Sequence, residues 1–134
     1  MNATKKTLAE LANDVQIEVR PGEAKLAYDK RDEWQKNSND YRLTLKYQGR
    51  RMSLDFWQGM GIKTAPDAKG VLDCLLSDAS CSLDSFEDFC SNCGYDSDSR
   101  KAYRLYTACV KSTARLQKLL GADYDAFFEA QRGE

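Results

Sequence analysis

Four of the chain's five cysteines lie between residues 74 and 93, in the stretch CLLSDASCSLDSFEDFCSNC. Their spacing, C-x6-C-x8-C-x2-C, is compatible with a metal site, a disulfide framework or the buried side of two helices. Cys90 and Cys93 fall beside Phe86 and Phe89 on the apolar stripe of one short expected helix. Because free cysteine is among the most buried residue types, we favour core cysteines over zinc binding or redox chemistry. We therefore expect no metal site and no cofactor.

Other residue types that carry chemistry are sparse. The sequence contains no histidine, which removes the commonest general base and most zinc sites. It has no P-loop, dinucleotide fingerprint or nucleophile elbow. Asp96 and Asp98 have the spacing that begins a calcium loop, but Lys101 and Thr107 stand where glycine and glutamate are needed. We expect no catalytic residues and no enzyme activity.

Acidic residues are concentrated in the middle of the chain. Residues 66–99 carry one basic and eight acidic side chains, whereas residues 1–65 and 100–134 each have a net charge of +3. Such asymmetry indicates either a surface that faces a charged partner or blocks that neutralise each other inside the fold. The carboxylates also suit the solvated first turns of helices. The candidate protein-binding residues are Asp84, Glu87, Asp88, Asp96 and Asp98.

Basic residues follow one face of a long expected helix. This face lies opposite Leu105, Cys109 and Leu116 on a helical wheel. It is either the solvated face of an amphipathic helix or a track for phosphates. Arg50 and Arg51 add a second, weaker basic point at a hairpin tip. The candidate nucleic-acid-binding residues are Arg100, Arg104, Lys111, Arg115 and Lys118.

The clearest structural signal is a β-hairpin over residues 41–57, YRLTLKYQGRRMSLDFW. Two alternating runs surround Gly49 and Arg50, and a two-residue loop with glycine first suits a type II′ turn. Six apolar side chains then share one face of the sheet. The expected pairs are Tyr47 with Met52, Leu45 with Leu54, and Leu43 with Phe56.

The remaining elements follow from apolar periodicity and capping residues. We expect a helix over 4–13, a strand over 15–20, a loop over 37–40, and four helices after residue 64. Their expected bounds are Thr64 (N-cap) to Ala79, Asp84 (N-cap) to Gly94, Asp96 or Ser97 (N-cap) to Leu120, and 123–130. The inward residues of the long helix are expected to be Ala102, Leu105, Cys109, Ser112, Leu116 and Leu119.

The fold class that follows is α+β, with a small antiparallel sheet packed against a helical C-terminal half. The sheet is built on the 41–57 hairpin plus the strand near 15–20. At 134 residues, the chain is expected to form a single domain over 1–134, mainly sheet in 1–65 and helical in 66–130. It has no apolar run of about 20 residues and no secretory signal, so we expect a cytoplasmic protein with no membrane partner.

Three motif strings carry a resemblance to a known group: YRLTLKYQGRRMSLDFWQGMG, VLDCLLSDAS and FEDFCSNCGYDSDSRKAYRLYTACVKSTARLQKLLG. The sequence resembles small phage and prophage proteins over residues 41–120. This resemblance implies an accessory protein of a mobile element in the host bacterial cytoplasm, where inhibitors of host defence such as anti-CRISPR proteins act by binding. It implies no catalytic residues.

Two functional hypotheses follow. The first is a protein that binds and inhibits a host defence complex, such as a CRISPR effector, through the acidic surface of residues 66–99. The alternative is an accessory protein that binds nucleic acid through the basic helix 100–118. The sequence assigns no oligomeric state.

Overall fold

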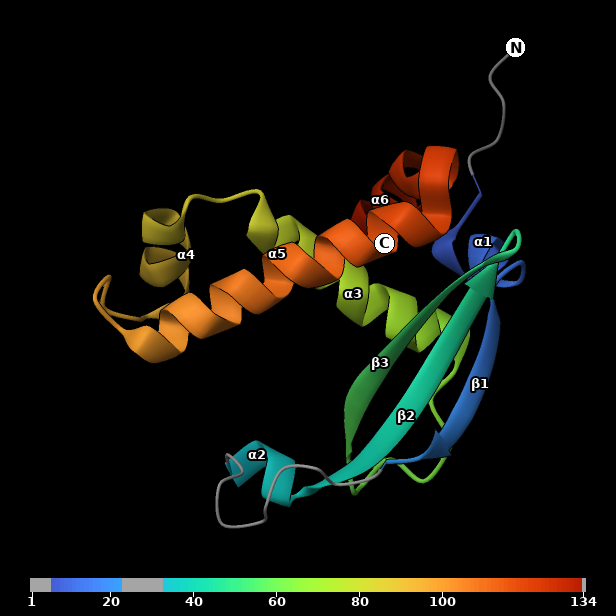
Figure 1. Ribbon diagram of the computed structural model, residues 1–134, viewed down its shortest axis with the longest axis horizontal. Coiled ribbons are helices and arrows are strands. Elements are labelled where there is room, and N and C mark those ends of the chain that lie inside the picture. The colour runs from blue at the N-terminus through green and yellow to red at the C-terminus, as the bar shows by residue number, and fades with distance from the viewer. Residues whose placement is uncertain (1–5, 23–32, 134) are drawn as a thin grey trace.

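The computed structural model describes residues 6–22 and 33–133 and has the expected α+β fold (Figure 1). Three antiparallel strands form a sheet in the order β1-β2-β3, and the C-terminal half is helical. The strands are β1 (Gln16–Pro21), β2 (Ser38–Tyr47) and β3 (Arg50–Gly59). The helices are α1 (Leu8–Ala12), α2 (Glu33–Lys36), α3 (Ala68–Ser82), α4 (Phe86–Cys93), α5 (Arg100–Leu120), the 3-10 helix η2 (Gly121–Asp123) and α6 (Tyr124–Arg132).

The main core lies between one face of the sheet and the helices α1, α3, α5 and α6. Leu43, Leu45 and Met52 point into it from the hairpin. The other sheet face is polar, as the alternation of residue types predicts. Figure 1 shows α3 and α5 extending together beyond the sheet to α4, which lies far from the hairpin tip.

The predicted register of the hairpin is wrong by two residues. Tyr47 pairs with Arg50, so the loop consists of Gln48 and Gly49, with φ of 49° and 79°. Two positive φ values are typical of a type I′ turn, not the expected type II′. Since side chains alternate with period two, the shift leaves every apolar residue on its predicted face. Leu45 therefore pairs with Met52, Leu43 with Leu54, and Tyr41 with Phe56.

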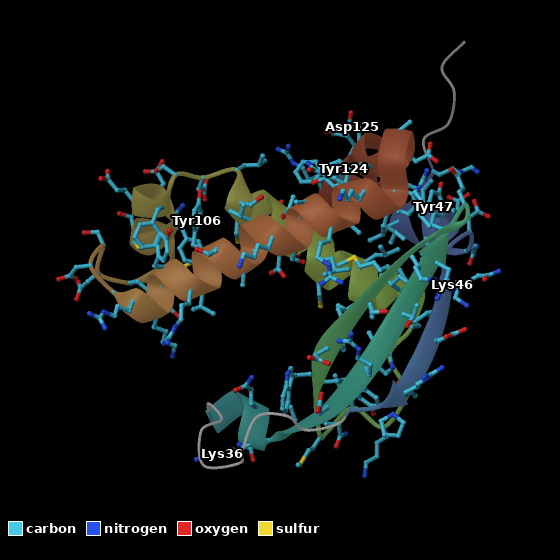
Figure 2. All side chains as sticks on the ribbon, in the orientation of Figure 1. Lys36, Lys46, Tyr47, Tyr106, Tyr124 and Asp125 are labelled. Atoms are coloured by element: carbon cyan, nitrogen blue, oxygen red, sulfur yellow. The ribbon has the colours of Figure 1, made fainter. Side chains whose placement is uncertain are left out.

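Three side-chain hydrogen bonds join the hairpin end to the C-terminal helices, one of them from Gln48 Nε2 to Asp123 Oδ2 at 3.2 Å. The hydroxyl of Tyr47 donates to Asp123 Oδ2 at 2.7 Å, and Arg50 donates to the carbonyl oxygen of Leu119. Figure 2 shows Tyr47 at the sheet end next to these helices. Arg50 thus lies on the core side of β3, although its charge suggested a turn position. Burial and the Asp123 bond raise the pKa of Tyr47 to about 12.

The predicted start of α3 is also wrong. Asp67 caps this helix, accepting a hydrogen bond from the Gly70 amide at 2.7 Å, whereas Thr64 lies outside it. Asp67 is the N-cap in place of Thr64 because Pro66, which has no amide hydrogen, directly precedes Asp67. The expected loop over 37–40 instead contains the start of β2 at Ser38. Residues 23–32 of the unpatterned segment 22–40 lie outside the described residues.

Candidate functional site

Residues 83–99 form a small lobe around α4, which we call the α4 lobe. A second core, separate from the main one, fixes it to α5. Phe89, Cys90 and Ala102 are buried in this core. Partly buried side chains surround them: Cys81, Phe86, Tyr95 and Tyr106. Because the lobe has its own apolar contacts, its surface residues are held in a defined arrangement.

Tyr106 of α5 is the main link between the helix and the lobe. Its ring lies 5.3 Å from the ring of Phe89 and 5.6 Å from that of Phe86, measured between centroids. Its hydroxyl donates to the backbone carbonyl oxygen of Asp84 at 2.6 Å. Figure 2 shows Tyr106 next to α4. The apolar ring and the polar tip therefore both fix the start of the lobe.

Capping at α4 differs from the prediction at one end. Ser85, not Asp84, is the N-cap, and its Oγ accepts from the Asp88 amide at 3.1 Å. Gly94 ends the helix in a left-handed conformation, φ 76°, as predicted. Asp84 is left outside the helix, where its carboxylate accepts a hydrogen bond from the Asn92 side chain at 3.4 Å.

The start of α5 also lies later than predicted. Ser99 caps the helix, with its Oγ accepting from the Ala102 amide at 3.1 Å. Neither Asp96 nor Ser97, the expected caps, has this role. Asp96 and Asp98 therefore lie in the loop between α4 and α5, with their carboxylates exposed.

The structure gathers all five predicted acidic residues on the α4 lobe. Four of them are exposed, and Asp84 is partly buried. Within 6–22 and 33–133, none of the five forms an ion pair; the ion pairs there include Arg42 with Asp55 and Lys46 with Glu18. Direct pairing between the acidic and basic blocks therefore does not neutralise this lobe. Its residues are Asp84, Glu87, Asp88, Asp96 and Asp98.

The predicted basic stripe of α5 is exposed along its whole length. Arg100, Arg104, Lys111, Arg115 and Lys118 are all exposed. Arg115 also donates a hydrogen bond to the backbone carbonyl oxygen of Ser53 in β3. Since this bond attaches α5 to the sheet, Arg115 has a structural role that the sequence did not indicate.

An exposed aromatic ring lies at the border of the basic stripe. Tyr103 is 59% exposed, and its ring packs edge-on against Phe86 at 5.5 Å between centroids. Tyr103, Arg104 and Lys111 line a shallow hollow of about 250 Å³ on α5. A supported aromatic ring beside cations is the arrangement on which unpaired bases stack. The sequence pattern did not indicate it, because Tyr103 falls between the apolar and basic faces of the helix.

The apolar stripe of α5 differs partly from the prediction. Ala102, Leu116 and Leu119 are buried as expected, whereas Leu105 is 40% exposed. Thr113 is buried instead, and its hydroxyl donates a hydrogen bond to the carbonyl oxygen of Cys109. In its first half, α5 joins the second core through Ala102 and Tyr106.

The polar face of the sheet carries further cations, which sequence reasoning did not combine into a site. Lys46 donates to Glu18 at 2.8 Å, and Arg42 donates to Asp55 at 3.1 Å. Arg51 lies directly opposite Lys46 on the neighbouring strand. Like charges in this position destabilise the pairing of the two strands. The hydrogen bond from Lys46 also lowers the pKa of Glu18.

The prediction of core cysteines is confirmed for Cys90 and wrong for Cys74 and Cys93, which are exposed. Cys93 is exposed because it is the last residue of α4, beyond the contacts of Phe89. Cys81 and Cys109 are partly buried. Burial raises the pKa of Cys109 to about 11, so this thiol is protonated and weakly nucleophilic at neutral pH.

Among the residues that the structure describes, no group of three or more cysteine or carboxylate side chains is arranged to hold a metal ion. Burial raises the pKa of the thiol of Cys74, Cys81 and Cys90, which disfavours the thiolate that metals bind. In the same described part of the chain, the helices are too short or too polar to span a bilayer.

No protein-family model, curated protein or solved structure matches this chain.

Proposed function

We propose that this protein acts by binding and not by catalysis, and that its α4 lobe docks on a basic surface of a host protein complex. The target class is a host defence complex that holds nucleic acid, such as a CRISPR effector, in the bacterial cytoplasm. The observation that supports this proposal is the set of five carboxylates on one lobe, with no internal ion pair among the described residues.

The form of the lobe suits such docking. A surface held by its own core loses little conformational entropy on binding. Uncompensated carboxylates accelerate association with a basic surface and make it salt-dependent. Leu83, 71% exposed beside Asp84, offers an apolar contact among the charges. A lobe of this kind can occupy a site that otherwise binds phosphates.

The binding step is tested by capture from a nuclease-treated host lysate with the tagged chain. The test variant combines Asp96→Lys with Asp98→Lys, because both side chains lie outside the helices. The matched control combines Asp125→Lys with Glu129→Lys, two exposed acidic residues on α6. We expect the lobe variant to lose a discrete protein complex that wild type and control retain. Equal capture by all three proteins would exclude the lobe as the docking surface.

The inhibition step needs a separate measurement on the captured complex. Binding of a labelled nucleic acid to that complex is measured as the wild-type chain is added. We expect competition, and we expect the Asp96 and Asp98 variant to compete at least about tenfold less well, as for loss of charged interface contacts. If nucleic-acid binding is unchanged at a saturating concentration of the chain, the protein binds the complex but does not inhibit it in the proposed way.

A second candidate function is nucleic-acid binding through α5. It is favoured by the exposed basic stripe and by Tyr103, whose supported ring lines one hollow with Arg104 and Lys111. The test is salt-dependent retention of a single-stranded oligonucleotide by the purified chain. Arg104→Glu with Lys111→Glu should abolish retention, whereas Lys101→Glu, outside the stripe, should change it little. Arg115 is left intact because it contacts Ser53.

A further inference from the structure

Two pairs of like charges lie directly opposite each other on the polar face of the sheet: Arg20 with Arg42, and Lys46 with Arg51 (Figure 2). Like charges in this position destabilise the pairing of strands. The first pair is compensated, because Asp55 lies opposite Arg42 on β3 and accepts its hydrogen bond at 3.1 Å. The second pair differs from it in this respect.

The row of the second pair lacks an acid, because its β1 residue is Gln16. The side chains of Gln16 and Arg51 form no hydrogen bond or ion pair within the described part of the chain. Lys46 donates one of its three ammonium hydrogens to Glu18 at 2.8 Å, so two remain. The row therefore offers a guanidinium, an ammonium and an amide to a ligand.

A hollow of about 250 Å³ lies at this row, beside the hairpin turn. Gln16, Lys46 and Arg51 all line it. Arg50 also lines the hollow, although its guanidinium is already bonded to α5. Among the described residues of the lining, Asp14 is the acidic one, so three cations and one carboxylate leave a net charge of +2. The volume is below that of most drug-sized ligand sites and suits a small anionic group.

A dianionic group at this position would convert the repulsion between Lys46 and Arg51 into attraction. Cross-strand neighbours of this kind have Cβ atoms about 4.5–5.5 Å apart, so one group can contact both side chains. A phosphate monoester carries a charge of about −1.5 to −2 and three acceptor oxygens. It can also accept two parallel hydrogen bonds from a guanidinium. A carboxylate has a single charge, which would compensate one cation of the pair and not both.

We infer that the hollow beside the hairpin turn binds a phosphate monoester, with Lys46 and Arg51 as its charged donors and Gln16 as a neutral donor. The phosphate belongs to a free phosphorylated compound or to the end of a nucleic-acid strand, two sources that share this chemistry. The site lies on the polar face of the sheet. It does not depend on the proposed role of the α4 lobe or on the basic stripe of α5.

The test is a titration of the isotope-labelled chain with inorganic phosphate, followed by nuclear magnetic resonance. Signals of residues 46–51 and of the Gln16 side chain should shift and saturate. Sodium chloride at equal ionic strength, the control for screening, should not reproduce these shifts. Arg51→Gln should weaken phosphate binding about tenfold or more, as for a lost charged hydrogen bond. The matched control Arg20→Gln removes an exposed cation of the same sheet face outside the hollow, and it should bind like the wild type.

A second readout and a second variant keep the test decisive. Phosphate should raise the unfolding temperature of the wild type and of Arg20→Gln, but not that of Arg51→Gln. Gln16→Ala, at an exposed position, should weaken binding severalfold even if Arg51→Gln does not fold.

The two sources are compared with a nucleoside monophosphate and with an oligonucleotide that carries a terminal phosphate. Both probes should bind through Arg51, and the tighter one identifies the source. The same oligonucleotide without its terminal phosphate should bind at least about tenfold more weakly at this site. Shifts that chloride reproduces, equal phosphate affinity of the wild type, Arg51→Gln and Gln16→Ala, or equal binding of the two oligonucleotides would overturn the proposal.

Discussion

The guanidinium of Arg50, at the start of β3, donates from Nε to the carbonyl oxygen of Leu119 in the last turn of α5, at 2.8 Å. The last carbonyls of a helix have no partner within the helix and carry partial negative charge. Gly121, at φ 57°, ends α5 next to this guanidinium. The hairpin thus provides a positive cap for the helix that carries the basic stripe and packs against the α4 lobe.

Replacing Arg50 should therefore destabilise the fold. We expect Arg50→Ala to lower the free energy of unfolding by about 1–3 kcal/mol, because the Leu119 carbonyl loses a charged donor. Urea denaturation followed by circular dichroism measures this change. Arg51→Ala is the control, since Arg51 is exposed on the opposite sheet face, and it should cost less than about 0.5 kcal/mol. Equal losses for both variants would show that the Leu119 contact adds no stability.

The Tyr47–Asp123 bond predicts a dependence of stability on alkaline pH. The folded-state pKa of Tyr47 is raised from 10.0 to about 12, so its contribution is complete below pH 10 and is lost as the pH rises to about 12. The loss should be on the order of 2–3 kcal/mol. This loss is measured by urea denaturation of the wild type and of Tyr47→Phe between pH 10 and pH 12.

Tyr47→Phe should be less stable than wild type by about 1 kcal/mol at neutral pH, because the bond to Asp123 is lost. The difference should disappear or reverse toward pH 12. Tyr103→Phe, at an exposed position, should follow the wild-type curve throughout. A Tyr47→Phe curve parallel to wild type from pH 9 to 12 would mean that Tyr47 titrates at its ordinary value.

The capping of α4 can be tested with two neighbouring residues. Ser85→Ala removes the acceptor for the Asp88 amide, so it should cost about 0.5–2 kcal/mol. Asp84→Ala removes a carboxylate that caps no helix, and it should cost less. Thermal or urea unfolding compares the two. If Asp84→Ala proves the more costly substitution, then Asp84 caps the helix, as the sequence alone suggested.

The separate core of the α4 lobe predicts local unfolding. Phe89→Ala should remove most of the apolar contact of this core, a loss of about 3–5 kcal/mol for a buried phenylalanine. Amide hydrogen exchange should accelerate in α4 while β2 stays protected. Uniform acceleration across the chain would mean that the lobe and the main core unfold together. Partner binding through the lobe should fall in proportion to its loss of structure.

The hairpin shows what a residue pattern can and cannot predict. The alternation of Leu43, Leu45 and Met52 correctly identifies the strands and the buried face. It does not distinguish registers two residues apart, because both bury the same side chains. Gln48 has a positive φ in the observed register, and in this register Arg50 reaches α5, a contact remote in sequence. Tertiary contacts of this kind decide the register.

The candidate sites were predictable to different degrees. The acidic and basic residues are visible as charge blocks, and periodicity places them on exposed faces. The role of Arg115 at β3 depends on the packing of α5 against the sheet. The exposure of Cys93 depends on where α4 ends. Such features need the positions of neighbouring elements, which one sequence does not supply.

The central claim is that the carboxylates of the α4 lobe contact a basic surface of a protein partner. Its most direct test is the dissociation constant of the purified, nuclease-treated partner complex for wild type, for Asp84→Lys with Asp88→Lys, and for the α6 control Asp125→Lys with Glu129→Lys, at low and moderate salt. We predict at least about tenfold weaker binding for the lobe variant, and a salt dependence that the variant loses. Binding that is equal in the three proteins, or capture of nucleic acid alone, would contradict it.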